Sequence, residues 1–161
     1  MTVVVRRLGG EEWEVLRAVR LAALADAPYA FRATLDDERV QNEATWRERV
    51  GDQAWFVAFD DEAPVGVASG GQLREPDPGV RTLRSMWVEA AHRGEGVAHR
   101  LVEAVVDWAR GDGARELTLW ALDAASRAQA FYARAGFSVL PATSDGLAGS
   151  HPAMTRYSLA L

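Results

Sequence analysis

A glycine-punctuated turn, Arg93-Gly94-Glu95-Gly96-Val97-Ala98, lies between an apolar run and a segment of helical periodicity. The apolar run ends at Val88, and the helical segment covers residues 97–112. Such a turn directs free backbone N–H groups and the positive end of a helix dipole at one point, which suits a phosphate group. Glycines at 94 and 96 let the main chain approach a ligand without obstruction by side chains. The turn therefore predicts a nucleotide or coenzyme site, in preference to an ordinary connection between strand and helix.

The composition excludes several other kinds of chemistry. No cysteine is present, so disulfides, thiolate metal sites and a covalent cysteine intermediate are ruled out. The three histidines, His92, His99 and His151, include no pair with metal-ligand spacing on a helix, so we expect no metal. All 18 basic residues are arginine, which leaves no lysine to act as a base or to form a Schiff base.

The net charge of −5 argues against nonspecific binding of nucleic acid, although a local group of N–H donors and arginines still suits an anionic coenzyme. No apolar run is long enough to span a membrane, and the N-terminus lacks the order of a signal peptide. We therefore expect a cytoplasmic protein with no membrane partner, and a single domain over residues 1–161. Six tryptophans are compatible with a homodimer, but no residue identifies an interface.

The elements expected around the turn form a mixed α/β domain with the order β-α-α-β-β-β-α-β-α-β-β. Strands are predicted at 3–8, 54–59, 65–72, 82–88, 116–122, 137–140 and 153–161. Helices are predicted at 11–24, at 34–50 as one or two helices capped by Asn42 or Thr45, and at 97–112 and 126–135.

This order, together with two segments, resembles the GCN5-related N-acetyltransferases. The coenzyme motif of that family reads Arg or Gln, two residues, Gly, one residue, Gly or Ala; Arg93, Gly96 and Ala98 match it. The second segment is 128–137, Ala-Gln-Ala-Phe-Tyr-Ala-Arg-Ala-Gly-Phe, on the following helix. The likeness covers nearly the whole chain in element order, and its specific residues lie between Ser85 and Phe137. It implies an acyl-CoA N-acyltransferase fold, which is α/β (α+β) with a mostly antiparallel central sheet flanked by helices.

The resemblance also implies acetyl-CoA as co-substrate and a set of residues that bind it. The turn residues Arg93, Gly94, Glu95, Gly96, Val97 and Ala98 would hold its pyrophosphate. Main-chain groups at Trp87 and Val88 would pair with the pantetheine arm, where the fourth strand separates from the fifth. The side chain of Trp87 has a competing role in the core. Ser126 and Ala128, on the next helix, would complete the coenzyme site.

Tyr132 matches the family tyrosine that protonates, or hydrogen-bonds to, the departing thiolate. A thiol has a pKa of about 8.5 and a phenol one of about 10, so this transfer is feasible. We expect Phe131 to be the core residue of this helix, with the hydroxyl group of Tyr132 facing elsewhere.

Two positions depart from the family pattern. Many relatives carry Asn seven residues before the tyrosine, where this chain has Ala125; the neighbouring Ser126 either substitutes for it in part or, as we favour, only caps the helix. Many relatives also carry a carboxylate on the fourth strand, where this chain has Arg84, which cannot act as a base. The general base then remains open between Glu89, Asp123, His151 and water.

The combined interpretation is direct transfer of an acetyl group from acetyl-CoA to a primary amine of a small molecule or a peptide N-terminus, in a ternary complex. The absence of cysteine excludes a route through an acyl-thioenzyme. The acceptor is open. Tyr29, Phe31, Trp46 and Trp55 lie in the expected acceptor region, the acidic run Asp36-Asp37-Glu38 would suit a cation unless it is a solvated helix start, and Arg84 would suit an anion.

A non-catalytic acyl-CoA-binding sensor or regulatory module is the alternative, because the usual Asn and carboxylate are missing. Retention of Tyr132 favours an enzyme over that module. A dinucleotide-dependent oxidoreductase is excluded by the strand order and by the lack of an acidic ribose-binding residue.

Overall fold

Successive residues of strand β2 (Ala54–Asp60) alternate between two buried faces of one sheet. Trp55, Val57 and Phe59 belong to one apolar cluster. Ala54, Phe56 and Ala58 belong to the other. The sheet is therefore the middle of three layers and carries a core on each side, as expected when helices cover both faces.

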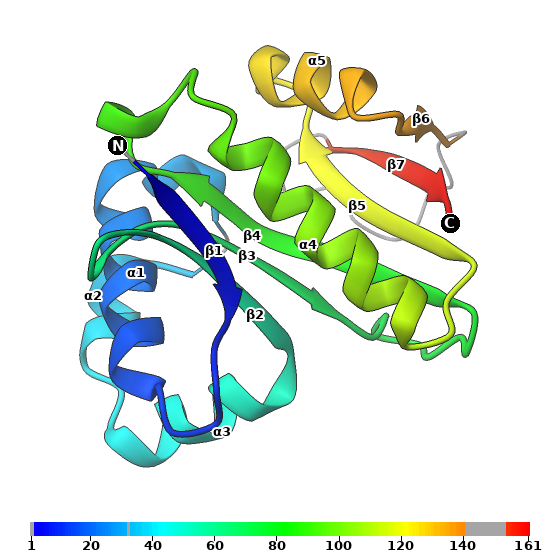
Figure 1. Cartoon of the computed structure of the whole chain (residues 1–161). Coiled ribbons are helices and arrows are strands. Elements are labelled where there is room, and N and C mark those ends of the chain that lie inside the picture. Colours follow the sequence, from blue (N-terminus) through cyan, green and yellow to red (C-terminus); the bar gives the residue numbers. More distant parts are fainter. Residues whose placement is uncertain (1, 32, 141–153) are drawn as a thin grey trace.

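The computed structural model describes residues 2–31, 33–140 and 154–161 (Figure 1). Its sheet has seven strands in the order β1-β2-β3-β4-β5-β7-β6. The other strands are β1 (Val3–Arg7), β3 (Ala63–Gly71), β4 (Val80–Val88), β5 (Glu116–Leu122), β6 (Ser138–Val139) and β7 (Met154–Ala160). All neighbours are antiparallel except β4 and β5, which are parallel. The predicted mixed, mostly antiparallel sheet flanked by helices is confirmed.

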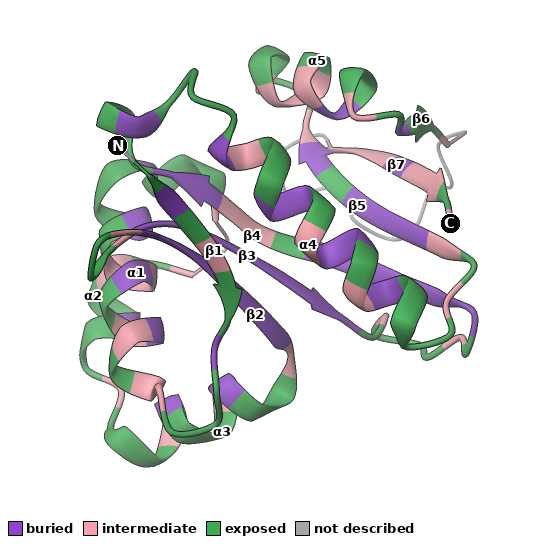
Figure 2. Cartoon of the chain, viewed as in Figure 1, coloured by how far each residue is buried: buried purple, intermediate pink, exposed green. Residues whose placement is uncertain are grey.

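Helices cover the two faces unequally. On one face lie α1 (Trp13–Asp26), α2 (Leu35–Arg39) and α3 (Glu43–Asp52); on the other lie α4 (Val97–Gly111) and α5 (Ser126–Arg134) (Figure 1). Short 3-10 turns occur at Pro28–Ala30 and Ala90–His92. Helix α4 buries Val97, Leu101, Val105 and Ala109, one residue per turn, against the middle of the sheet (Figure 2). That packing places the N-terminus of α4 at the end of β4.

Strands β4 and β5 pair over only three positions, from Val80 with Glu116 to Thr82 with Thr118. Beyond these positions the two strands have no mutual ladder among the described residues. A bulge interrupts β4 on its other side, because Ala68 of β3 stands opposite both Ser85 and Met86. Ser85 has a φ of 59°, a left-handed conformation that is rare for a residue with a side chain. The expected separation of the fourth and fifth strands is thus present, with a bulge beside it.

The predicted elements are confirmed with local corrections. Residues 34–50 form two helices, and the side chain of Asn42, rather than Thr45, caps the second by accepting from the Thr45 N–H at 2.9 Å. The side chain of Ser126 does not cap α5, whose N-cap residue is Ala125 without a side-chain hydrogen bond. The predicted strand at 137–140 is reduced to two residues of β6. Within the described residues, no helix is long and apolar enough to cross a membrane.

Gly70 on β3 provides a direct test of how α4 seats on the sheet. A Cβ at this position would lie 2.4 Å and 2.6 Å from two ring atoms of Trp108 on α4. Gly70→Ala should therefore lower the free energy of unfolding by about 1–3 kcal/mol, the usual cost of overpacking a core. Urea unfolding followed by tryptophan fluorescence measures this change. Gly51→Ala is the control, because a Cβ there meets nothing within 4 Å, and equal stability of the two variants would contradict the packing.

Candidate active site

The glycine-rich turn has the backbone geometry of an anion site. Gly94 and Gly96 have φ values of 83° and 82°, in the left-handed region that favours glycine. Gly96 is the N-cap residue of α4, and the first hydrogen bond of the helix runs from the Arg100 N–H to the Gly96 carbonyl. The N–H groups of Val97 and Ala98 precede that bond, and no backbone acceptor for them occurs among the described residues. They are available to an acceptor outside the backbone, and a phosphate at this turn stays a prediction.

The side chain of Arg93 is half-exposed and folds back over the surface toward β4 and α1. Its Nε donates to the Val88 carbonyl at 3.0 Å, and its Nη2 donates to Oδ2 of Asp26 at 2.6 Å. The same Oδ2 accepts from the indole N–H of Trp87 at 2.9 Å. The Trp87 hydrogen bond, followed by that of Arg93, lowers the pKa of the Asp26 carboxyl below its usual value. Arg93 therefore ties the turn to α1 and β4. It also occupies the carbonyl of Val88, one of the two residues whose main-chain groups were predicted to pair with the pantetheine arm.

Trp87 is buried, and its side chain belongs to the cluster on the α1 face. The sequence leaves Trp87 with two possible roles, in the core and in binding the coenzyme. The structure places its side chain in the core. The main-chain contact with the coenzyme stays a prediction.

A second ionic group lies beneath the turn, around the buried His92. Its Nε2 lies 3.1 Å from Oδ2 of Asp60 at the end of β2, and its Nδ1 lies 3.0 Å from Oε2 of Glu89. These carboxylates, Asp60 first, raise the pKa of the imidazole above its usual value. Glu89, a candidate general base, is thereby engaged in holding the turn.

A cavity of about 150 Å³ occupies the gap between β4 and β5. Its lining takes consecutive residues from each strand, 83–86 from β4 and 119–122 from β5. Neighbouring residues on a strand point to opposite faces, so a cavity lined by consecutive residues passes between the strands rather than over one face. The lining starts one residue after the last β4–β5 pair, Thr82 with Thr118.

Tyr132 closes one side of this cavity from α5, together with Ala125 and Ala128. Its ring is buried and makes edge contacts with Phe131 and Phe137, at centroid distances of 5.2 Å and 5.8 Å. Burial raises the pKa of the phenol well above its usual value, so the hydroxyl keeps its proton. The expectation that Phe131 is the core residue of α5 is wrong, because Tyr132 is the more deeply buried of the two.

The remaining predicted residues fall in different places. Ser126 is exposed and does not line the cavity, whereas Glu95 is an exposed turn residue. Asp123, a candidate base, accepts hydrogen bonds from Thr155 through its carboxylate and from Gln129 through its carbonyl. His151, the third candidate base, lies outside the described residues.

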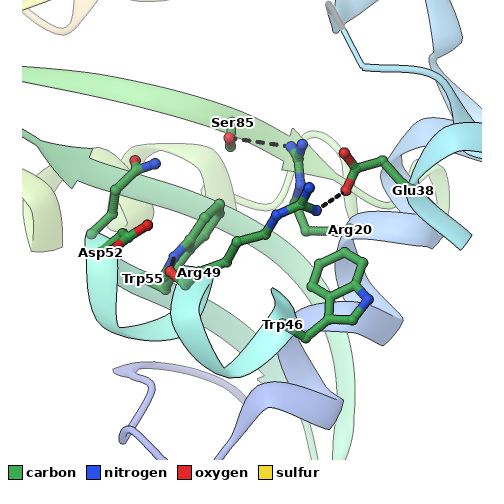
Figure 3. A pocket seen from close by; sticks show the side chains of 8 residues that line it. Arg20, Glu38, Trp46, Arg49, Asp52, Trp55 and Ser85 are labelled. Carbon is green, nitrogen blue, oxygen red and sulfur yellow. Dashed lines mark hydrogen bonds and ion pairs between the residues drawn. The ribbon is translucent and has the colours of Figure 1, made fainter. Parts of the chain in front are cut away.

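A second cavity, of about 160 Å³, lies on the α1 face of the sheet (Figure 3). Its lining residues are Arg20, Glu38, Trp46, Arg49, Asp52, Gln53, Trp55 and Ser85. Phe31 lines the first cavity, whereas Tyr29 is 76% exposed. The acidic run divides: Asp36 and Asp37 are exposed at the start of α2, but Glu38 is buried and paired with Arg49.

Sequence reasoning did not find Arg20, Asp26, Asp60 or Ser85. The left-handed backbone at Ser85 has no signal in the residue type, since serine rarely adopts it. Asp26 is the last residue of α1, and Asp60 is the last residue of β2. Each hydrogen-bonds to residues that are far away in the sequence and that only the fold brings near. Arg20 follows Val19, one of the buried apolar positions of α1. An arginine so close to a buried stripe is the one sequence signal that could have indicated a functional role for it.

Comparison with known proteins gives two kinds of match. Residues 18–137 match the family model of the Acetyltransferase (GNAT) family. The mycothiol acetyltransferase of Beutenbergia cavernae is 27% identical over 135 residues, which are 83% of this chain and 44% of that protein. The chain thus spans less than half the length of this curated relative.

Solved structures share the fold at low sequence identity. A GNAT-family acetyltransferase from Streptococcus pneumoniae superposes with a TM-score of 0.79 at 15% identity, over 99% of this chain and 100% of that one. The yncA protein of Salmonella typhimurium, solved with its cofactor acetyl-CoA, gives 0.74 at 18% identity, over 99% and 94%. These likenesses confirm the acyl-CoA N-acyltransferase fold.

The environment of His92 makes a pH-dependent contribution to stability. Its pKa is raised in the folded protein, so protonation stabilises the fold fully below the unfolded value of about 6.5, and this gain is lost as the pH rises through the folded value. The stability difference between wild type and His92→Gln should be largest near pH 5.5 and shrink toward pH 8.5. Urea unfolding at each pH measures it, with His99→Gln, on the exposed side of α4, as the control. A difference that stays constant or grows with pH would contradict the two-carboxylate environment.

Proposed function

The chain belongs to the Acetyltransferase (GNAT) family, and from this premise we propose that it transfers an acetyl group from acetyl-CoA to a primary amine in a ternary complex. The observation that carries the proposal is the placing of Tyr132 on a cavity that runs between β4 and β5. That cavity lies in the same part of the sheet as the glycine-rich turn that follows β4. The proposed site thus combines the glycine-rich turn that follows β4 with a protonated phenol on the cavity.

The residues of the turn fit the phosphates of the coenzyme. The unpaired N–H groups at the start of α4 and the positive end of its dipole attract an anion, although the protein as a whole carries a net charge of −5. Open space surrounds the Cβ directions of both Gly94 and Gly96, so the main chain is accessible there. Arg93 contributes by fixing the turn through Asp26 and Val88, rather than by a free charge.

Bound acetyl-CoA supplies the acetyl group as a thioester. In the proposed transfer the acceptor nitrogen attacks the carbonyl carbon, the carbon–sulfur bond breaks, and the Tyr132 hydroxyl donates its proton to the sulfur that leaves. The raised pKa of Tyr132 keeps the phenol protonated, so its O–H is present as a hydrogen-bond donor to the sulfur when the carbon–sulfur bond breaks. With no cysteine in the chain, a route through an acyl-thioenzyme is excluded, which favours a single displacement on a positioned amine.

The acceptor must lose a proton, and the strand position that often carries a carboxylate holds Arg84. Glu89 is held by His92, and Asp123 by Thr155. His151 lies outside the described residues, and of the candidates that the structure describes neither carboxylate is free. We therefore propose that the amine loses its proton to water in the cavity. The relative from Beutenbergia cavernae is named for mycothiol, but 27% identity over 44% of its length does not assign that acceptor here.

Tyr132→Phe tests the proton donor. The variant should keep its affinity for CoA and lose kcat by more than about tenfold, because general acid catalysis typically contributes far more than that. Release of CoA thiol measures kcat, and the cysteine-free protein adds no thiol background. Tyr157→Phe is the matched control, since that buried tyrosine packs 6.3 Å from the Tyr132 ring and does not line the cavity. A kcat within twofold of wild type would remove Tyr132 from the mechanism, and CoA binding without transfer to any amine would favour the sensor alternative.

Gly96→Ala tests the coenzyme turn. An alanine at a φ of 82° costs about 1–2 kcal/mol. The turn should relax in the free protein, so CoA binding should weaken by about tenfold. Titration calorimetry with CoA measures the affinity. Gly111→Ala, at the other end of α4, is the control, and equal affinities of the two variants would argue against the turn as the phosphate site.

A further inference from the structure

The two cavities share one residue, Ser85, at the bulge of β4. The first cavity lies between β4 and β5, and the second lies on the α1 face. Because one residue of β3 stands opposite two of β4 here, the strand turns Ser85 toward the helices on that face. An acceptor whose amine lies in the first cavity therefore has the α1 face beside Ser85 for its remaining groups.

Arg20 of α1 reaches the bulge from the α1 face. Its Nη1 donates to Oγ of Ser85 at 3.2 Å (Figure 3). Its guanidinium lies 5.3 Å from the ring centroid of Phe31 and 5.9 Å from that of Trp55. Phe31 lines the first cavity and Trp55 the second, so Arg20 stands at the junction of both.

Arg84 reaches the junction from β4 itself. Its Nη2 donates to the Gln72 carbonyl at 2.9 Å, and its Nη1 passes across Gly71, where a Cβ would lie 3.3 Å from it. The side chain of Gln53, which lines the second cavity, is equally close to that Gly71 position, at 3.2 Å. Arg84 also lines the first cavity. The Arg84 guanidinium therefore lies near both cavities, and it belongs to the residue directly before Ser85.

Neither guanidinium forms an ion pair with a carboxylate of the described residues. Burial lowers the pKa of both arginines, although Glu38 partly offsets this for Arg20. Arg20 is half-buried, whereas Arg84 is more exposed. A partly desolvated cation without a paired anion is unfavourable, because desolvation is not repaid by a nearby opposite charge. Arg20 lines the second cavity and Arg84 lines the first, so an anion at the Ser85 junction between the two cavities would have both cations near it.

The acidic residues of the second cavity do not supply that anion. Glu38 is the partner of Arg49 (Figure 3). Asp52 is exposed at the C-terminal end of α3. A cationic group would thus find Glu38 already neutralised and would meet two arginines. This arrangement disfavours a polyamine acceptor.

We infer that the acceptor carries a free carboxylate as well as its amine, and that Arg20 and Arg84 bind this carboxylate at the Ser85 junction. The inference rests on the proposed acetyl transfer and gives it a substrate class: amino acids or short peptides with a free carboxylate. A guanidinium presents a planar pair of N–H donors that matches a carboxylate.

The test compares acceptors that differ only in the carboxylate. L-Amino acids and dipeptides are each paired with the corresponding C-terminal amide. Acetyl transfer is followed by CoA release, and binding to the CoA-loaded protein is measured by calorimetry, which does not require turnover. We expect the free acids to bind at least tenfold more tightly than their amides and to show the same preference in kcat/KM.

Arg84→Gln and Arg20→Gln should each bring the acid-to-amide ratio toward one, while the affinity for CoA, which reports an intact fold, stays at the wild-type value. Arg20→Lys keeps the charge and should restore the ratio in part. Arg110→Gln, an exposed arginine near the C-terminus of α4, is the control and should leave the ratio unchanged.

Equal use and binding of acids and amides would overturn the inference and leave acetyl transfer standing. A preference for acids that survives in both glutamine variants, or a stronger preference for O-phosphoethanolamine, would also overturn it. Binding that depends on the carboxylate without any acetyl transfer would support this site and contradict the proposed enzyme. The two proposals therefore fail in different ways.

Discussion

The separation of β4 from β5 is the constraint on which the rest of this structure depends. The parallel ladder stops at Thr82 and Thr118, and from the next residue onward the two strands enclose a cavity. The bulge at Ser85 lies on the opposite edge of β4, where its positive φ stores strain that the flanking packing must offset. Helix α4 bridges the divided sheet and holds both halves in one core, so the opening persists without unfolding the strands.

Charged groups hold the glycine-rich turn in place, and the N–H groups of Val97 and Ala98 keep no backbone acceptor among the described residues. Asp26 binds Arg93 and Trp87 together, and His92 joins Glu89 to Asp60. Both groups connect the turn to the ends of elements far away in the sequence. The side chains of both groups hold the turn in position. The N–H groups that remain available to a ligand are therefore those of the main chain. A local group of main-chain N–H donors can bind a polyanion even in an acidic protein, as the proposed coenzyme site requires.

The donor and acceptor sides of the proposed site use different parts of the chain, the main chain for the donor and side chains for the acceptor. The donor side uses backbone N–H groups and glycine conformations, which suit any molecule with the same pyrophosphate and pantetheine groups. The acceptor side uses individual side chains, chiefly Arg20 and Arg84, from α1 and β4. Because backbone geometry follows the fold while side chains change freely, the family membership supports the donor and leaves the acceptor to this chain's own residues.

The sequence by itself determined the element order, the glycine-rich turn and the family, because periodicity and glycine spacing are local properties of the chain. It also placed Tyr132 on a helix near the turn, although it assigned the deeper burial to Phe131. Only the tertiary structure decided that Arg93 turns inward to Asp26, that Glu38 is neutralised by Arg49, and that Arg20 meets Ser85, 65 residues later. These contacts join distant segments, and the backbone of Ser85 is held left-handed by its surroundings. No local pattern encodes where two such segments meet, which is why the coenzyme could be predicted from the residues and the acceptor site required the fold.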